Sequence, residues 1–510
     1  MKKQILLLAA VAFIIACTLP LGTPAPQPEI ATAPPSTSTG NPTDSPGSAM
    51  IHVDSCGADP RDTNPDSEAI QQCVDMASSG DTVLFTSGTN LPDYQGYLID
   101  KTIFLVANTA KTHLTFTATD PENRALLQAT DDLKGFVVSL VSRSQVPNYG
   151  EVDDITISHL HIDGNRGARV CHGQDRFANG VDDSWGTWLP FECPNPGDGL
   201  CNPGTLSMCA ASDLQDVGQD YVGNPSAWST GLVVDDSYIS NTECATALVL
   251  CAADSMIRDT TIDVAGDHVL NPSCEQTDNA EPESNWSDGI TFEGPGHMIT
   301  GNTVLDASDV GIVFFGGRDT VISNNTIQAR PGNHGMFAAI AIHPWGWGDV
   351  TGVEITDNVV INDASSSCGG IHAGINIGTH MWGGGCVGSA DRVSVGNPNI
   401  CTAEPPQPMG IQCMQGQPCQ TWAHVAAGET LTLRDNHVTG AQVNYLIEGL
   451  DLAGTLVESG NISTAPRITD WETDANCGMG GGNDSWTTID FAAHHPAIPG
   501  WTDQRIHCEY

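Results

Sequence analysis

Two aspartates near the middle of the chain are spaced like equivalent residues on neighbouring coils of a repeating structure. Residues 287–290 (Ser-Asp-Gly-Ile) are followed by the similar run 308–312 (Ser-Asp-Val-Gly-Ile), so Asp288 and Asp309 are 21 positions apart. Equivalent residues on adjacent parallel strands lie ~4.8 Å apart, and two carboxyls that close do not both ionise freely. Such a pair can supply the acid and the base of glycosidic bond hydrolysis. Both residues also suit turns before strands, where aspartate bonds its own backbone.

Further candidate residues lie close by in the sequence. Glu293 is on the same expected strand as Asp288 and is a third candidate acid, or a strand-end acid without function. His334 lies in a glycine-rich turn before the expected strand 339–342 and is a candidate auxiliary catalytic residue. Tryptophans in loops can stack on sugar faces, whereas buried tryptophans only fill the core. The candidate substrate-binding residues, besides Glu293, are Arg318, His343, Trp345, Trp347 and His372.

The elements that position these residues repeat every 21 to 23 positions. Residues 299–304 (Ile-Thr-Gly-Asn-Thr-Val) resemble residues 322–327 (Ile-Ser-Asn-Asn-Thr-Ile), 23 positions later. Short β-branched runs with this period indicate stacked strand units, not a coiled coil or a doubly wound fold. One unit cannot bury its apolar face alone, so neighbouring coils stack into a continuous core. The sequence therefore predicts an all-β solenoid of parallel strands.

The first coil is expected to open with a short helix. Asn64 and Pro65 suit the N-cap and the first helical position, and apolar residues recur at helical spacing up to Ala77. Gly80-Asp81 ends this helix. Strands are predicted at residues 82–85, 97–99 and 102–105.

These segments resemble the N-terminal cap and first coil of the pectate-lyase superfamily. The resemblance rests on a Gly-Ala-Asp opening at 57–59, the Ala-Ile-Gln of the helix, the strand Gly-Asp-Thr-Val-Leu-Phe at 80–85, and an Asp-Gly-Asn turn at 163–165. It implies a right-handed parallel β-helix with a single strand of chain per coil. Because such folds host many functions, it implies little about the substrate.

A narrower, partial resemblance links the candidate residues to polygalacturonase-like glycoside hydrolases. Residues 287–289 resemble the first catalytic turn of that family, 308–309 resemble its aspartate pair with one aspartate missing, and 333–335 resemble its histidine turn. The Arg-Ile-Lys tripeptide that grips a uronate in that family has no counterpart here. The resemblance thus implies hydrolysis of a polysaccharide without implying a uronic acid substrate.

The N-terminus reads as an export signal. Two lysines precede an apolar run that is too short to cross a bilayer. Residues 14–17 (Ile-Ile-Ala-Cys) resemble a bacterial lipoprotein cleavage box, which implies removal of residues 1–16 and lipidation of Cys17. Residues 17–50 form a Pro/Thr/Ser-rich tether. The expected location is outside the cell, lipid-anchored to the outer membrane or the cell surface.

The rest of the chain divides into a β-helix and a cap. The β-helix is expected over 51–465, interrupted by a loop insertion at 171–227, and residues 466–510 are expected to cap its open end. Sixteen cysteines besides Cys17 support disulfides in an exported chain. Cys56/Cys73 and Cys477/Cys508 look like local pairs. Asparagines that recur beside the strands are expected to be structural: Asn241, Asn302, Asn325, Asn358, Asn436 and Asn461.

The charge balance limits the possible partners. The chain has 61 acidic and 18 basic residues, a net charge of −43, which argues against nucleic acid as a partner. No cofactor is predicted, although Ca²⁺ can bridge an acidic surface to a polyanionic glycan. The expected protein is a monomeric, carbohydrate-active hydrolase that uses Asp288 and Asp309.

Two alternatives remain open on the sequence. One is a polysaccharide lyase or epimerase that uses Arg318 or a histidine with Ca²⁺, although no lysine follows Lys134 to act as a base. The other is a non-catalytic surface module that binds glycans or mediates adhesion.

Overall fold

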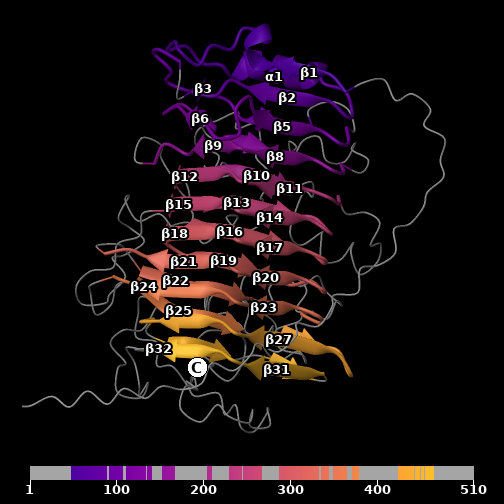
Figure 1. Cartoon of the computed structure of the whole chain (residues 1–510), viewed down its shortest axis with the longest axis vertical. Helices are drawn as coiled ribbons and strands as arrows, with labels where there is room; N and C mark the ends of the chain where they lie inside the picture. Colours follow the sequence, from indigo (N-terminus) through magenta and orange to yellow (C-terminus); the bar gives the residue numbers. More distant parts are fainter. Residues whose placement is uncertain are drawn as a thin grey trace, which may run out of the picture. The chain divides into compact units, whose positions relative to one another are not determined.

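Three parallel β-sheets make up most of the described structure. The computed structural model describes residues 48–88, 91–106, 111–133, 135–140, 152–166, 204–209, 229–243, 245–266, 287–331, 335–343, 349–364, 370–377, 423–441, 443–447, 450–452 and 454–464. Figure 1 shows the strands as stacks of short arrows, one coil above the next. None of the helices within these residues is long and apolar enough to cross a membrane.

Sheet A contains, in spatial order, β1 (Met50–His52), β2 (Thr82–Phe85), β5 (Thr115–Ala118), β8 (Thr156–Ser158), β11 (Val233–Asp235), β14 (Met256–Arg258), β17 (Met298–Thr300), β20 (Val321–Ser323), β23 (Glu354–Thr356), β27 (Thr430–Arg434) and β31 (Thr455–Ser459). Sheet B contains β3 (Tyr97–Ile99), β6 (Ala125–Ala129), β9 (Leu160–Asp163), β12 (Tyr238–Thr242), β15 (Thr261–Ala265), β18 (Thr303–Ala307), β21 (Thr326–Ala329), β24 (Val359–Asn362), β28 (His437–Thr439) and β32 (Ile462–Thr464).

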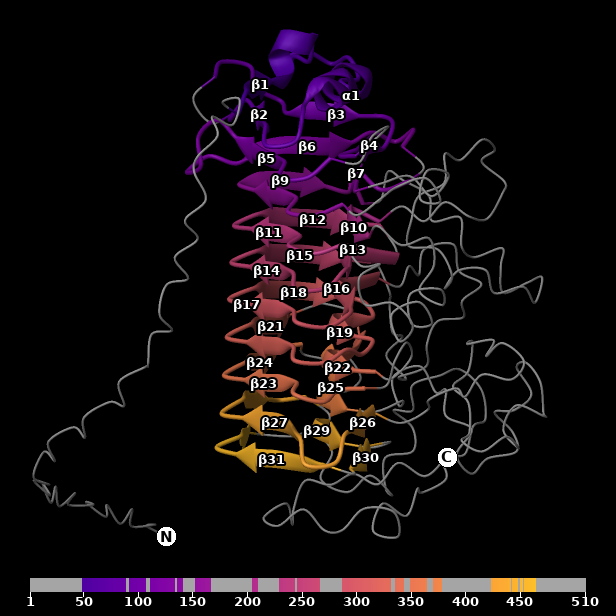
Figure 2. The same ribbon diagram turned by 90° about the vertical axis from the view of Figure 1, so that its right-hand side faces the viewer.

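Sheet C carries most of the candidate residues. It contains β4 (Ile103–Phe104), β7 (Val138–Ser139), β10 (Leu206–Cys209), β13 (Ala245–Cys251), β16 (Ser287–Glu293), β19 (Val310–Phe314), β22 (Gly335–Ile342), β25 (Gly370–Ile377) and β29 (Val443–Ile447). Figure 2 shows β10 to β25 of this sheet one above another. A small separate sheet pairs β26 (Ala423–Val425) with β30 (Leu450–Leu452).

The chain visits sheets A, B and C in turn, and every pairing between successive coils is parallel. One coil is β14, β15 and β16, and the next is β17, β18 and β19. Identical residues stack in register at equivalent positions, so Ile299 lies between Ile257 and Ile322 in sheet A, and all three are fully buried. The rings of Phe292 and Phe314 stack in the same way in sheet C. This arrangement is a parallel β-helix with a continuous apolar core, as predicted.

A buried asparagine ladder runs along the turns from sheet A to sheet B. The side-chain amide of Asn302 donates to Asn325 Oδ1 at 3.0 Å, and Asn325 donates in the same way to Asn358. The ladder continues through Asn436 to Asn461. The structural role predicted for these five asparagines is confirmed. Asn241 is outside the ladder: it has a positive φ of 53° and donates to Asp163 Oδ2 instead.

The helix begins later than predicted. The structure places α1 at Ser67–Met76, with Asp66 rather than Asn64 at the N-cap. Asp66 exchanges hydrogen bonds with β3, because its backbone N–H donates to Leu98 O and its carboxylate accepts from Leu98 N–H. These contacts fix Asp66 to the sheet, so helical geometry starts only after it. The side chain of Gln71 then pairs with the backbone of Phe104 in β4, which joins the helix to the first coil.

The expected strands at 82–85 and 97–99 are confirmed, and the one at 102–105 is shortened to β4. The disulfide Cys56–Cys73 is confirmed. The insertion predicted at 171–227 is wrong as a single loop, because it contains β10, which pairs with β7 and β13. All four residues of β10 are buried, and Cys209 is bonded to Cys251 on the next coil. The signal peptide, Cys17, residues 17–47 of the tether, Cys477, Cys508 and the cap lie outside the described residues. Strand β1 already begins at Met50, the last residue of the predicted tether.

Candidate functional site

The described candidate residues are distributed along sheet C. Asp288 is the second residue of β16, Asp309 immediately precedes β19, and Glu293 ends β16. His343 directly follows β22. His334, Trp345 and Trp347 lie outside the described residues, as does the side chain of His372.

The pairing of β16 with β19 changes register beside Asp288 and Asp309. Strands β16 and β19 pair with Ile290 opposite Ile312, and Asp309 N–H donates to Ser287 O at 3.0 Å. That bond spans 22 positions, whereas the equivalent bond from Phe315 N–H to Phe292 O in the same ladder spans 23. Strand β19 therefore has one extra residue at its start, as in a β-bulge, and Asp309 and Val310 both lie across from Asp288. The apolar column of isoleucines sets the register, because a slip of one residue would turn core side chains outward. The two aspartates are therefore neighbours on adjacent coils.

The carboxyl group of Asp288 is buried and held at both oxygens. Asp288 is only 3 % exposed. Its Oδ1 accepts a hydrogen bond from Val310 N–H at 3.1 Å, and its Oδ2 lies 2.8 Å from the hydroxyl oxygen of Thr291. Burial removes water from the charged form and raises the pKa of Asp288 to about 7. Asp288 is thus an acid that keeps its proton up to neutral pH.

Two buried threonines extend this site onto the neighbouring coil. Thr291 Oγ1 lies 3.0 Å from Thr246 Oγ1, and Thr246 donates to Leu248 O at 3.0 Å. In the pairing of β13 with β16, Thr246 is directly opposite Asp288. Sequence reasoning missed both threonines. The available signal was a polar residue beside apolar strand residues: Thr246 precedes the apolar run 247–250, and Thr291 lies between Ile290 and Phe292.

Glu293 and His343 lie at the carboxyl ends of the strands of sheet C, whereas Asp288 and Asp309 lie at the amino ends. Glu293 is five residues beyond Asp288 on one extended strand, roughly 17 Å away at ~3.3 Å per residue. Paired carboxyls in glycoside hydrolases are about 5 to 9.5 Å apart, so Glu293 cannot pair with Asp288. The ring of His343 packs edge-on against the ring of Phe315, with the ring centroids 6.1 Å apart. On the preceding coil, Cys251 is opposite Glu293. Of the described candidate acids, Asp309 is the partner at the same end as Asp288.

Arg318 lies outside both groups. It follows β19 in the turn toward β20, eight residues beyond Val310. Its guanidinium group lies 3.9 Å from the carboxylate of Asp349, and its side chain is 42 % exposed. The structure therefore does not bring Arg318 to Asp288.

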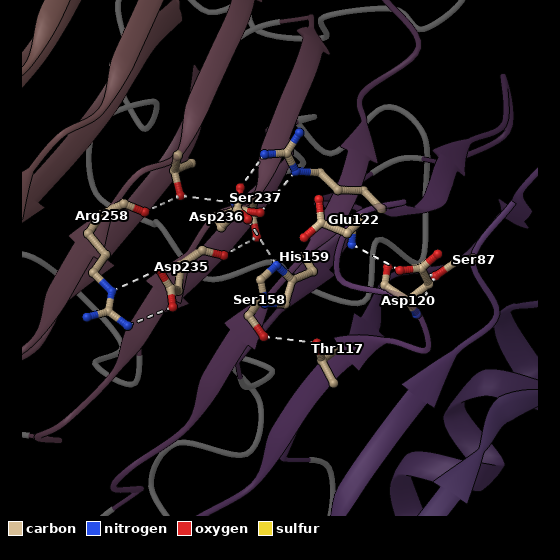
Figure 3. A network of polar contacts seen from close by, with 12 residues as sticks. Ser87, Thr117, Asp120, Glu122, Ser158, His159, Asp235, Asp236, Ser237 and Arg258 are labelled. Atoms are coloured by element: carbon tan, nitrogen blue, oxygen red, sulfur yellow. Dashed lines mark hydrogen bonds and ion pairs between the residues drawn. The ribbon is translucent and has the colours of Figure 1, made fainter. Parts of the chain in front are cut away.

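A second polar cluster lies at the turns between sheets A and B (Figure 3). Arg258 forms two hydrogen bonds with the carboxylate of Asp235, at 2.8 and 2.7 Å. Asp236 contacts both Arg124 and His159. These partly exposed pairs join coils that are one or two steps apart, and we interpret them as structural. Within the described ranges, no group of three or more His, Cys, Asp or Glu side chains is arranged to hold a metal ion.

The fold defines the class of protein: over the described residues the chain is a parallel β-helix built from three sheets. No model of a known protein family matches the chain, and neither does any curated protein.

Similarity to solved structures is at the level of fold. The chain is similar to the tailspike protein of E. coli bacteriophage HK620 at 10 % identity, covering 82 % of this chain and 58 % of that one, with a TM-score of 0.48. It is similar to an exopolygalacturonase from Thermotoga maritima at 12 % identity, covering 81 % and 87 %, with a TM-score of 0.38. It is similar to PfbA, a surface adhesin of Streptococcus pneumoniae, at 11 % identity, covering 82 % of this chain and 92 % of that one, with a TM-score of 0.35.

Proposed function

We propose that the protein is an exported enzyme that hydrolyses glycosidic bonds of an extracellular polysaccharide. The observation that carries this proposal is the carboxyl of Asp288, which is buried, held at both oxygens and has a pKa of about 7. A general acid must be protonated at the working pH, and this environment meets that requirement. Asp309 on the adjacent coil supplies the second carboxyl.

The reaction assigns one proton transfer to each aspartate. Asp288 gives its proton to the glycosidic oxygen as the bond from that oxygen to the anomeric carbon breaks. The carboxylate of Asp309 takes a proton from the water whose oxygen forms the new bond to that carbon. Each side chain then exchanges its proton with solvent, which restores the starting state.

Replacement of either aspartate tests the proposal. Asp288→Asn and Asp309→Asn should each lower the release of reducing ends from a polysaccharide panel by about a hundredfold or more, as expected for loss of general acid or base catalysis. At pH ~4, where the folded wild type keeps this proton and the unfolded wild type has lost it only in part, the thermal midpoint of Asp288→Asn should be nearly unchanged, because an asparagine resembles the protonated acid. Wild-type activity should fall as pH rises through the pKa of Asp288, about 7.

The matched control is Asp357→Asn, at an exposed turn residue with a φ of 58° that asparagine also tolerates. It should keep full activity. Full activity in both Asp288→Asn and Asp309→Asn would refute the assignment.

A non-catalytic glycan-binding module is the second candidate. The observation in its favour is burial, since Asp288, Asp309 and Glu293 are exposed by only 3 %, 5 % and 3 %. Retention of the protein on a glycan panel, with no new reducing ends and no difference between wild type and the aspartate variants, would favour this function.

A further inference from the structure

Asp288, Thr291 and Thr246 form a series of three hydrogen bonds that ends on a backbone carbonyl. The separations are 2.8 Å from Asp288 Oδ2 to Thr291 Oγ1, 3.0 Å from Thr291 Oγ1 to Thr246 Oγ1, and 3.0 Å from Thr246 Oγ1 to Leu248 O. Both threonines are buried, at 1 % and 0 % exposure. No described hydrogen bond offers either hydroxyl group a different acceptor, so the direction of each bond can be worked out by counting protons.

The backbone carbonyl of Leu248 can only accept a hydrogen bond. Thr246 therefore donates its one hydroxyl proton to Leu248 O. Because Thr246 has no second proton, the bond between the two threonines requires Thr291 to be the donor. Thr291 then has no proton left for Asp288, and its oxygen can only accept.

The same count places a proton on Asp288. A bond between Asp288 Oδ2 and Thr291 requires a donor, and the one proton that remains available is that of a carboxylic acid on Oδ2. The other oxygen, Oδ1, stays an acceptor for Val310 N–H, which fits a neutral acid equally well. All four contacts are satisfied when Asp288 is neutral, and one is lost when it is ionised.

We propose that Thr246 and Thr291 are positioning residues that hold Asp288 in its neutral, proton-donating form through a directional chain of hydroxyl groups. When Asp288 gives up its proton, Thr291 turns its hydroxyl toward the new carboxylate, and its bond to Thr246 is lost. Ionisation of Asp288 therefore costs one buried hydrogen bond. The value of this arrangement for catalysis rests on the proposed function, whereas the position of the proton does not.

Thr246→Val is the decisive variant, because Thr246 acts on Asp288 only through Thr291. Valine has nearly the same shape and cannot accept a hydrogen bond, so Thr291 becomes free to donate to Asp288 and to stabilise its carboxylate. The pKa of Asp288 should fall by about one unit, the equivalent of one hydrogen bond. Burial alone predicts the opposite sign, since the added methyl group makes the surroundings less polar.

The measurement is infrared spectroscopy of protein labelled with ¹³C-aspartate, titrated without substrate. The spectrum of Asp288→Asn is subtracted so that the carboxyl band of Asp288 stands alone. Thr246→Ser keeps the hydroxyl and should titrate like wild type. A pKa that is unchanged or raised in Thr246→Val, or a wild-type Asp288 that ionises at the usual aspartate pKa, would overturn the proposed chain.

The outcome is distinguishable from failure of the proposed function. If the titration shifts as expected and no polysaccharide is cleaved, the hydroxyl chain stands and the catalytic role falls. If cleavage is observed, the alkaline limb of the kcat profile should move to lower pH in Thr246→Val by the same amount as the titration.

Discussion

Asp288 makes the stability of the protein depend on pH in an unusual direction. Its pKa is about 7 in the folded chain and 3.8 as the ordinary value. Between these values the folded state binds a proton that the unfolded state has released, so the free energy of unfolding falls as pH rises from about 4 to about 7. Below this window the stabilisation of the neutral acid is fully present.

Asp288→Asn should remove this pH-dependent loss of the free energy of unfolding. At pH ~4 the variant and wild type should unfold at similar urea concentrations, and by pH ~8 the variant should be more stable by up to about 4 kcal/mol. Urea denaturation at several pH values measures the difference. A constant difference across this range would show that Asp288 ionises normally in the folded protein.

Sequence reasoning found Asp288 from its residue type and spacing, and missed what surrounds it. The 21-residue interval predicted Asp309 directly opposite Asp288, whereas the core pairing of Ile290 with Ile312 has an interval of 22, so the sequence did not reveal the extra residue at the start of β19. Thr246 was not identified, because it is 42 residues from Asp288 and only the pairing of β13 with β16 brings them together.

At the scale of the elements, the asparagine ladder should be a major source of stability. Asn325 Oδ1 accepts from the backbone N–H and the side-chain amide of Asn302, and its own amide donates to Ile299 O and to Asn358. Asn325→Ala would leave these buried groups without partners. Because each such loss costs about 1–3 kcal/mol, the free energy of unfolding should fall by about 3 kcal/mol or more, measured by urea denaturation.

The adjacent residue supplies the control. Asn324 is exposed and has a φ of 57°, which glycine adopts without strain. Asn324→Gly should change stability by only a few tenths of a kcal/mol. Equal losses in the two variants would mean that the ladder does not contribute beyond the turn itself.

The elements differ in how well the sequence predicted them. Strands such as β2 and β3 have alternating apolar residues between clear turn signals, and their bounds were predicted as observed. Strand β10 was missed because four buried residues among glycine, proline and cysteine carry no usable period. The start of α1 was displaced because Asp66 bonds to a distant strand that no local pattern reveals.

At the scale of the whole molecule, the net charge of −43 works against folding through self-repulsion. Raising NaCl from ~0.1 to ~1 M shortens the screening length from about 10 to about 3 Å, so the thermal midpoint should rise at pH ~7. At pH ~4.5, close to the sequence pI of about 4.3, the net charge is small and the same salt should change the midpoint little. Similar shifts at both pH values would exclude charge repulsion as the cause.

The β-helix itself was predictable because stacked coils must carry similar residues at equivalent positions. Stacked parallel strands must repeat at equivalent positions to bury a common core, and this repetition is visible in residues 299–304 and 322–327. The polar chemistry of sheet C was not predictable, since it depends on which residues of distant coils face each other.

The asparagine ladder also bears on how such a chain can change over time. Successive ladder bonds join residues that are 23, 33, 78 and 25 positions apart, yet each bond has nearly the same length. The geometry of the β-helix therefore does not depend on how many residues are inserted between two successive coils. Segments between coils can lengthen, shorten or diversify while the scaffold that carries them keeps its geometry.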